Sequence, residues 1–222
     1  MLARSHFPFL GLVLIGSCCW LVGCSSAPSR VTAPGISGSA AGDAMTKYDK
    51  NSDGGLDDEE LKAVPALSKD CGTGDANVTG AKSRFDKNSD GKISADEIST
   101  RIGEWEASKV GLLQFSMQLT LDGRPLDGAT VTLVPEEFLG TAIKPATGTT
   151  DSSGRVDAVI AASDLQANEA GLSGMRVGAY KIQVTHPSIK IPAKYNTETT
   201  IGVEVAPDDP DSGRLVLPLK SR

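Results

Sequence analysis

The chain has 222 residues, enough for two small domains, with an aromatic content of 5% and a net charge of −6. A hydrophobic content of 39% is too low for many membrane spans, and the chain lacks the surplus of Lys and Arg that phosphate contacts need. These values exclude a multi-spanning membrane protein and argue against a nucleic-acid partner, whereas an acidic chain suits a cation ligand.

Residues 1–23 are predicted to be a secretory signal peptide, because Arg4 gives a positive start and residues 7–23 carry no charge. The tetrad Leu-Val-Gly-Cys that ends at Cys24 resembles the lipobox of bacterial lipoproteins. That resemblance implies that Cys24 is lipidated and that the protein is anchored to a membrane of the bacterial cell envelope, facing the periplasm or the surface. A retained membrane anchor is the alternative, since an uncharged run of about 17 residues is at the lower limit for a span.

Residues 24–42 are rich in Ser, Ala, Gly and Pro and are predicted to be a flexible linker. If Cys24 carries lipid, Cys71 is the single thiol of the mature chain, so no internal disulfide is expected. No activating neighbour for Cys71 is evident in the sequence, which favours a plain thiol over a nucleophile.

Residues 43–107 contain two similar loops with helical patterns around them. Tyr48 begins the sequence YDKNSDGGLD, and Phe85 begins the sequence FDKNSDGKIS. A helix capped by Asp75 is expected to enter the second loop, and apolar residues at helical spacing follow it at Ile98, Ile102 and Trp105. Pro65 should end the helix that leaves the first loop.

Both loops fit the pattern D-x-[DN]-x-[DN]-G-x₅-E of the EF-hand. In loop one, from Asp49 to Glu60, the predicted ligands are Asp49, Asn51, Asp53, Gly55, Asp57 and Glu60. In loop two, from Asp86 to Glu97, they are Asp86, Asn88, Asp90, Lys92, Ser94 and Glu97. Gly55 and Lys92 would contribute main-chain carbonyl oxygens.

The spacing points to Ca²⁺ as the cofactor, because this hard cation takes six to eight oxygen ligands and one tight loop must deliver several of them. Leu56 and Ile93 should pair between the loops. A pair of Asx-rich turns would explain the Asp, Asn and Gly residues but not Glu60 and Glu97. The dockerin family also repeats a calcium loop and binds a partner domain, but the long segment between these loops favours a paired EF-hand.

Charge predicts that loop one binds calcium more tightly than loop two. Loop one contains six acidic residues and one lysine, whereas loop two contains four acidic residues and two lysines. Pro65 and the short segment that enters loop one argue against this ranking, because they leave loop one with only short helices on either side. Calcium is expected to be mainly structural, since a sensor needs a groove to expose and the helices of the pair carry only Met45 as a methionine.

Residues 111–222 show a period of two, which predicts short strands and an all-β sandwich. The expected strands include 115–121, 155–161, 177–185, 199–206 and 214–219. Residues 121–131, 150–155 and 178–184 resemble the carboxypeptidase regulatory-like, or transthyretin-like, domains of bacterial surface proteins. That resemblance implies a small sandwich without catalytic residues. The predicted fold class is therefore α+β, with two domains: a helical EF-hand pair followed by a β-sandwich.

No catalytic set is evident: His186 lacks a placed carboxylate or nucleophile, and Lys194 and Tyr195 suit a solvated lysine beside a packed tyrosine. We therefore expect a non-enzymatic, exported, lipid-anchored calcium-binding protein. The alternatives are a calcium-stabilised adhesion or scaffold module with a protein or glycan partner, and a surface hydrolase, which a loss of turnover on mutation of His186 would favour.

Overall fold

The computed structural model describes residues 35–69, 80–209, 213 and 215–222. The predicted signal peptide, Cys24, Cys71 and the expected helix cap Asp75 lie outside the described residues. Within the described ranges, no helix combines the length and the apolar character that crossing a membrane would require.

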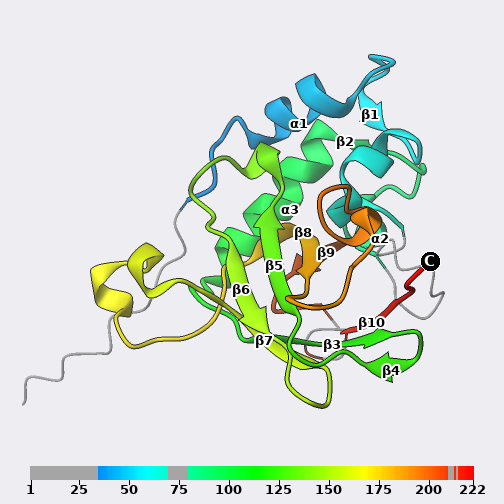
Figure 1. The fold of residues 1–222 in the computed structure, drawn as a ribbon. Helices are drawn as coiled ribbons and strands as arrows, with labels where there is room; N and C mark the ends of the chain where they lie inside the picture. The colour runs from blue at the N-terminus through cyan, green and yellow to red at the C-terminus, as the bar shows by residue number, and fades with distance from the viewer. Residues whose placement is uncertain (1–34, 70–79, 210–212, 214) are drawn as a thin grey trace, which may run out of the picture.

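The first part of the described chain is a helical segment built around the two loops (Figure 1). Its elements are α1 Ala40–Tyr48, β1 Gly55–Leu56, the 3-10 turns η1 Glu60–Ala63 and η2 Pro65–Leu67, α2 Lys82–Phe85, β2 Ile93–Ser94 and α3 Ala95–Ser108. Helix α1 begins at Ala40, inside the segment 24–42 that was predicted to be a linker, and Ala40 and Ala41 are buried. The exit from loop one is a 3-10 turn that stops before Pro65, because proline disfavours helical geometry in the residue that precedes it.

Helix α3 has a strong start and a buried face. The Ser94 hydroxyl accepts the N–H of Glu97, and the Glu97 carboxylate accepts the N–H of Ser94, so the two residues form a capping box. Ile98, Ile102 and Trp105 are buried along one face, as their spacing predicts. The ring of Trp105 meets that of Phe85 edge-on, with centroids 5.8 Å apart, so the helices on both sides of loop two pack together.

The second part is a curled sheet whose strands follow the order β10-β3-β7-β6-β5-β8-β9, with β4 paired to β3. The strands are β3 Phe115–Leu121, β4 Arg124–Pro125, β5 Thr130–Pro135, β6 Ala146–Thr149, β7 Arg155–Ile160, β8 Gly178–Thr185, β9 Gly202–Val205 and β10 Leu215–Leu219. Short 3-10 turns lie between them at η3 Glu137–Leu139, η4 Ala162–Asp164, η5 Ala167–Glu169 and η6 Ala193–Tyr195. All pairs are antiparallel except β10 with β3, which is parallel.

The predicted two-sheet sandwich is not confirmed, because one strand belongs to both halves of the sheet. Strand β7 pairs with β3 through residues 155–158 and with β6 through Val159 and Ile160. This change of partner along a single strand makes the sheet continuous, and it curls as a half-barrel (Figure 1). An α+β composition remains a fair description of the fold.

The predicted division into two domains is not confirmed either, since the buried apolar residues of both parts form one cluster. The η2 turn, which follows loop one, packs directly on β8 and β9. At Gly202 in β9, an added Cβ would lie 2.1 Å from the main-chain nitrogen of Ala66 and 2.2 Å from the carbonyl carbon of Pro65. Only glycine permits this close approach, so the contact between η2 and β9 depends on Gly202.

Candidate metal centre

Loop one leaves α1 at Asp49 and folds its polar side chains over its own backbone. The Asp49 carboxylate accepts the N–H groups of Asp53 and Gly54 at 3.3 and 3.0 Å. Asn51 Oδ1 accepts the N–H of Asp53 at 2.9 Å, and Asp53 Oδ1 accepts the N–H of Gly55 at 3.2 Å. These bonds fix the side chains at positions one, three and five of the loop, where oxygen ligands are required.

Loop two repeats the same bonds in the same order. The Asp86 carboxylate accepts the N–H groups of Asp90 and Gly91 at 3.1 and 3.0 Å. Asn88 Oδ1 accepts the N–H of Asp90 at 2.9 Å, and Asp90 Oδ1 accepts the N–H of Lys92 at 2.9 Å. The repeated sequence therefore produces a repeated local structure.

Left-handed backbone at two positions gives each loop its sharp turn. Gly54 and Gly91, at position six, both have a φ of +90°, and Ser52 and Ser89, at position four, have φ values of 57° and 60°. Glycine adopts this region without a steric penalty, which explains why position six is glycine in both copies.

The glutamates at position twelve lie almost buried beneath their loops. Glu60 Oε1 accepts the N–H groups of Lys50 and Asn51 at 2.7 and 3.2 Å, and Glu97 holds the corresponding groups of loop two at 2.9 and 3.3 Å. Burial raises the pKa of Glu97, but hydrogen bonds from the backbone and hydroxyl of Ser94 and from two further N–H groups outweigh it and hold the pKa below its usual value. Glu97 is therefore a carboxylate at neutral pH.

The two loops are joined by a short antiparallel pair, β1 with β2. Leu56 pairs with Ile93, as predicted, and both side chains are fully buried. Gly55 pairs with Ser94. The two loops are therefore joined into one structural unit.

The donor set of the loops fits calcium. Among the residues that the structure describes, no group of three His, Cys, Asp or Glu side chains is gathered closely enough to hold a metal ion. Each loop, however, also offers an amide oxygen, from Asn51 or Asn88, and a carbonyl oxygen, from Gly55 or Lys92. A carboxylate oxygen that accepts one N–H retains a second lone pair for a cation. An all-oxygen set of this kind suits a hard ion, and the role of the twelve residues as its ligands stays a prediction.

A buried carboxylate of the sheet ties down both helices that frame loop two. Glu204 in β9 is 1% exposed; it accepts a hydrogen bond from Arg101 Nε at 2.6 Å and from Trp105 Nε1 at 2.7 Å, both in α3. It also pairs with Arg84 of α2. Arg101 further binds the carboxylate of Asp208 with two nitrogens, at 2.9 Å each. No sequence pattern marks this cluster, because Glu204 lies about a hundred residues from Arg84, Arg101 and Trp105.

A second buried carboxylate, Glu136, follows β5 next to the exit from loop one. Its Oε1 accepts the N–H of Ala66 in η2 at 3.2 Å, while Oε2 has no hydrogen-bond partner and lies 3.4 Å from Lys181 Nζ. Burial raises the pKa of Glu136 to about 7, more than the nearby Lys181 lowers it. The hydroxyl of Tyr48, immediately before loop one, is likewise buried without a partner.

His186 and Lys194, the other polar residues considered as possible site residues, both make contacts within the sheet region. His186 Nε2 bonds the carbonyl of Asp127 at 2.8 Å, and its Nδ1 accepts the N–H groups of Ser188 and Ile189 at 3.1 and 3.0 Å. Lys194 lies over the ring of Tyr195, which is buried. Both ring nitrogens of His186 are thus engaged by main-chain groups.

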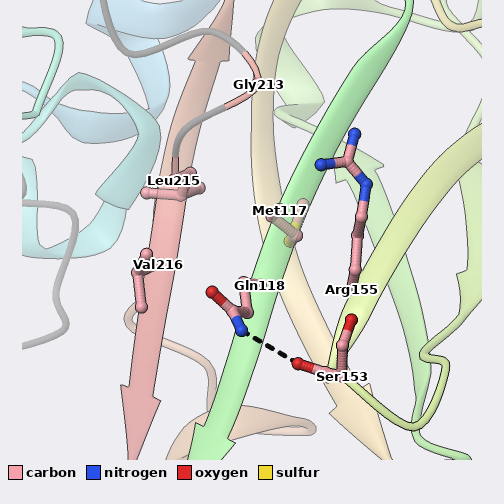
Figure 2. Close-up of a pocket in the computed structure, with 7 residues that line it drawn as sticks. All are labelled: Met117, Gln118, Ser153, Arg155, Gly213, Leu215 and Val216. Carbon is pink, nitrogen blue, oxygen red and sulfur yellow. Dashed lines mark hydrogen bonds between the residues drawn. The ribbon is translucent and has the colours of Figure 1, made fainter.

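A hollow of 230 Å³ lies on the sheet, lined by residues in or next to β3, β7 and β10 (Figure 2). Its lining residues are Met117, Gln118, Ser153, Arg155, Gly213, Leu215 and Val216. Figure 2 shows that Gln118 turns toward the backbone of Ser153, to whose carbonyl it donates a hydrogen bond of 2.9 Å. Arg155 is the one titratable side chain among these lining residues, so this lining does not provide an acid–base pair.

Comparison with known proteins identifies the class of the two loops. The family model of the EF hand matches residues 42–65 and 83–102, and each matched segment contains one loop. These matches support calcium binding by the chain. They do not extend to the sheet, whose resemblance to carboxypeptidase regulatory-like domains is not confirmed. No curated protein and no solved structure matches the chain.

Proposed function

We propose that this protein is an exported, lipid-anchored calcium-binding protein of the bacterial cell envelope, and that calcium serves mainly to stiffen its helical segment. The observation that carries the proposal is the pair of EF-hand loops, which repeat one hydrogen-bond pattern and are joined through β1 and β2. The proposal assigns the chain no catalytic role, since the histidine that a hydrolase would use is engaged by main-chain groups.

The packing of the helices supports a structural role over a sensor role. A sensor opens its helices to expose an apolar groove when calcium binds. Here Ile98, Ile102 and Trp105 are buried, and Arg84 and Arg101 bind the same buried Glu204 from the two helices that frame loop two. Opening this pair would leave a buried carboxylate without its partners, which is costly.

Neutralising each position-twelve glutamate tests calcium binding. We expect Glu60→Gln and Glu97→Gln each to weaken calcium binding by one loop by on the order of tenfold or more, because each change removes a charged ligand. Calorimetric titration of the purified protein with calcium measures this. Glu106→Gln in the last turn of α3, an exposed position outside both loops, is the control and should titrate as the unaltered protein does. Equal calcium heats in all four proteins would contradict the proposal.

Anchoring depends on Cys24. We expect Cys24→Ala to move the protein from the membrane fraction to the soluble fraction or to block its processing, because stable anchoring needs about two acyl chains and the cysteine would carry them. Cys18→Ala, which changes a cysteine inside the predicted signal peptide, is the control. An unmodified mature chain that begins at another residue, found by mass spectrometry, would contradict this part of the proposal.

A further inference from the structure

Lys92 belongs to loop two, but its ammonium group lies beside Asp53 of loop one. It occupies position seven of loop two, where its carbonyl oxygen is the predicted ligand. Its side chain crosses the β1–β2 pair, and Nζ forms an ion pair with the Asp53 Oδ2 of loop one. Asp53 is the position-five ligand of that loop, so a cation from the protein already sits on an oxygen that calcium would use.

The path of this side chain depends on a glycine. A Cβ added to Gly55 would lie 3.0 Å from Lys92 Cβ and 3.2 Å from Lys92 Cδ, closer than ordinary packing. The aliphatic stem of Lys92 therefore rests on the bare backbone of Gly55, at position seven of loop one. A glycine here makes room for the crossing: the register pairs Gly55 with Ser94, and Lys92, two residues before Ser94, lies diagonally across from Gly55.

The electrostatic surroundings of Lys92 also come from loop one. The hydrogen bond to Asp53 raises the pKa of Lys92, loss of hydration opposes this rise, and the charges of Asp53, Asp57 and Glu60 add to it. The same ion pair lowers the pKa of Asp53. All three acids are predicted calcium ligands, so Lys92 and a calcium ion compete for one region of negative charge.

The arrangement is not reciprocal. Loop one has Gly55 at position seven, and glycine offers no cation to loop two. The other lysine of loop two, Lys87, turns away and pairs with Glu104 of α3 at 2.8 Å. Lys82 reaches loop two only at the carbonyl of Gly91 and otherwise binds Asp58. Among these three lysines, only Lys92 places its ammonium group on the side chain of a predicted ligand.

We propose that Lys92 is a built-in counter-cation of loop one, which calcium must displace from Asp53, so that loop two fills before loop one. This inference rests on the proposed calcium binding and reverses the order that counting acids in the two loops predicts. Residue counts place Lys92 in loop two, whereas the fold places its charge in loop one. The excess negative charge of loop one is thereby reduced at the ligand that has to bind. Loop one is also the less firmly held loop, because a short 3-10 turn follows it whereas the capped helix α3 follows loop two.

The order of filling is measured on the unaltered protein. The amide groups of Gly54 and Gly91 each bond the first aspartate of their own loop, so their NMR resonances report the two loops separately. On titration with calcium, the Gly91 resonance should respond at a lower concentration than that of Gly54. A response of Gly54 first, or of both together, would overturn the proposal. If neither resonance responds and no heat is released, calcium binding itself is wrong, which is a different outcome.

A matched pair of lysine variants isolates the contact. In the Glu97→Gln background, where loop one is the remaining intact loop, Lys92→Gln should raise calcium affinity by about two- to fivefold, the effect that an exposed ion pair gives. Lys87→Gln removes the same charge from the same loop, but the ammonium group of Lys87 pairs with Glu104, which is not a predicted ligand. This variant should leave the calcium affinity of loop one nearly unchanged. Equal effects of the two variants would show that the contact with Asp53 does not matter and would overturn the proposal.

Discussion

Replacing Glu204 with alanine should lower the free energy of unfolding by about 3–5 kcal/mol, because removing one partner of a buried ion pair leaves the other charge buried and uncompensated. Arg101 is 2% exposed, and Trp105 Nε1 would lose the acceptor that it has at 2.7 Å. The same change should weaken calcium binding by loop two, since Arg84 and Arg101 anchor the helices on both sides of it. Denaturant unfolding and a calcium titration on the same sample measure the two effects.

Glu198→Ala is the control for this prediction. Glu198 is an exposed acid that precedes β9, and surface changes of this kind are usually within about 0.5 kcal/mol. If Glu204→Ala unfolds at the same denaturant concentration as Glu198→Ala, the buried cluster does not hold the helical segment on the sheet.

Glu136→Gln should stabilise the protein near pH 8 and have little effect near pH 5. The pKa of Glu136 is raised by burial from 4.5 to about 7, so the folded state binds its proton more tightly than the unfolded state does. Between these two values the stability of the unaltered protein falls as the pH rises, because the folded chain must either keep a proton or bury a charge. The full difference is about 3–4 kcal/mol, at about 1.4 kcal/mol per pKa unit.

The glutamine keeps an oxygen for the N–H of Ala66 and removes the charge, so the slope of stability against pH should flatten between about pH 5 and 7. Glu137→Gln is the neighbouring control: Glu137 is mostly exposed and pairs with Lys47, which lowers its pKa. It should leave the slope between these pH values unchanged. An identical slope for the unaltered protein and for Glu136→Gln would show that Glu136 does not titrate in this range.

The loops were predictable because their structure depends on short-range spacing. Asp49, Gly54 and Glu60 lie within twelve residues of one another, and the carboxylates of Asp49 and Glu60 accept N–H groups from the backbone of their own loop. Strand β3 was predicted to the residue for a similar reason, since apolar and polar residues alternate without a break over residues 115–121 and the apolar Phe115, Met117 and Leu119 are buried. Strand β6 was missed, because only Ala146 of its four residues is buried and no alternation of apolar residues marks it.

What the sequence did not reveal depends on pairing between distant segments. Whether strands form a sandwich or a single curled sheet depends on the partners of β7, and its alternation is the same in either case. Glu204 looks like an ordinary polar residue of a strand until Arg84 and Arg101 are placed against it. Gly202 carries no local signal of the close approach of η2. The reach of Lys92 into loop one likewise follows from the pairing of β1 with β2 and not from its position in the sequence.

The number of calcium ions bound by one chain shows directly whether each of the two loops binds one ion. Native mass spectrometry of the purified protein, titrated with calcium, should show a species with two ions that saturates, and the double variant Glu60→Gln/Glu97→Gln should lose it. Magnesium at the same concentrations is the control, because this smaller ion dehydrates reluctantly and prefers sites with retained water. If the unaltered protein and the double variant show the same distribution of calcium adducts, the two loops are not the calcium sites.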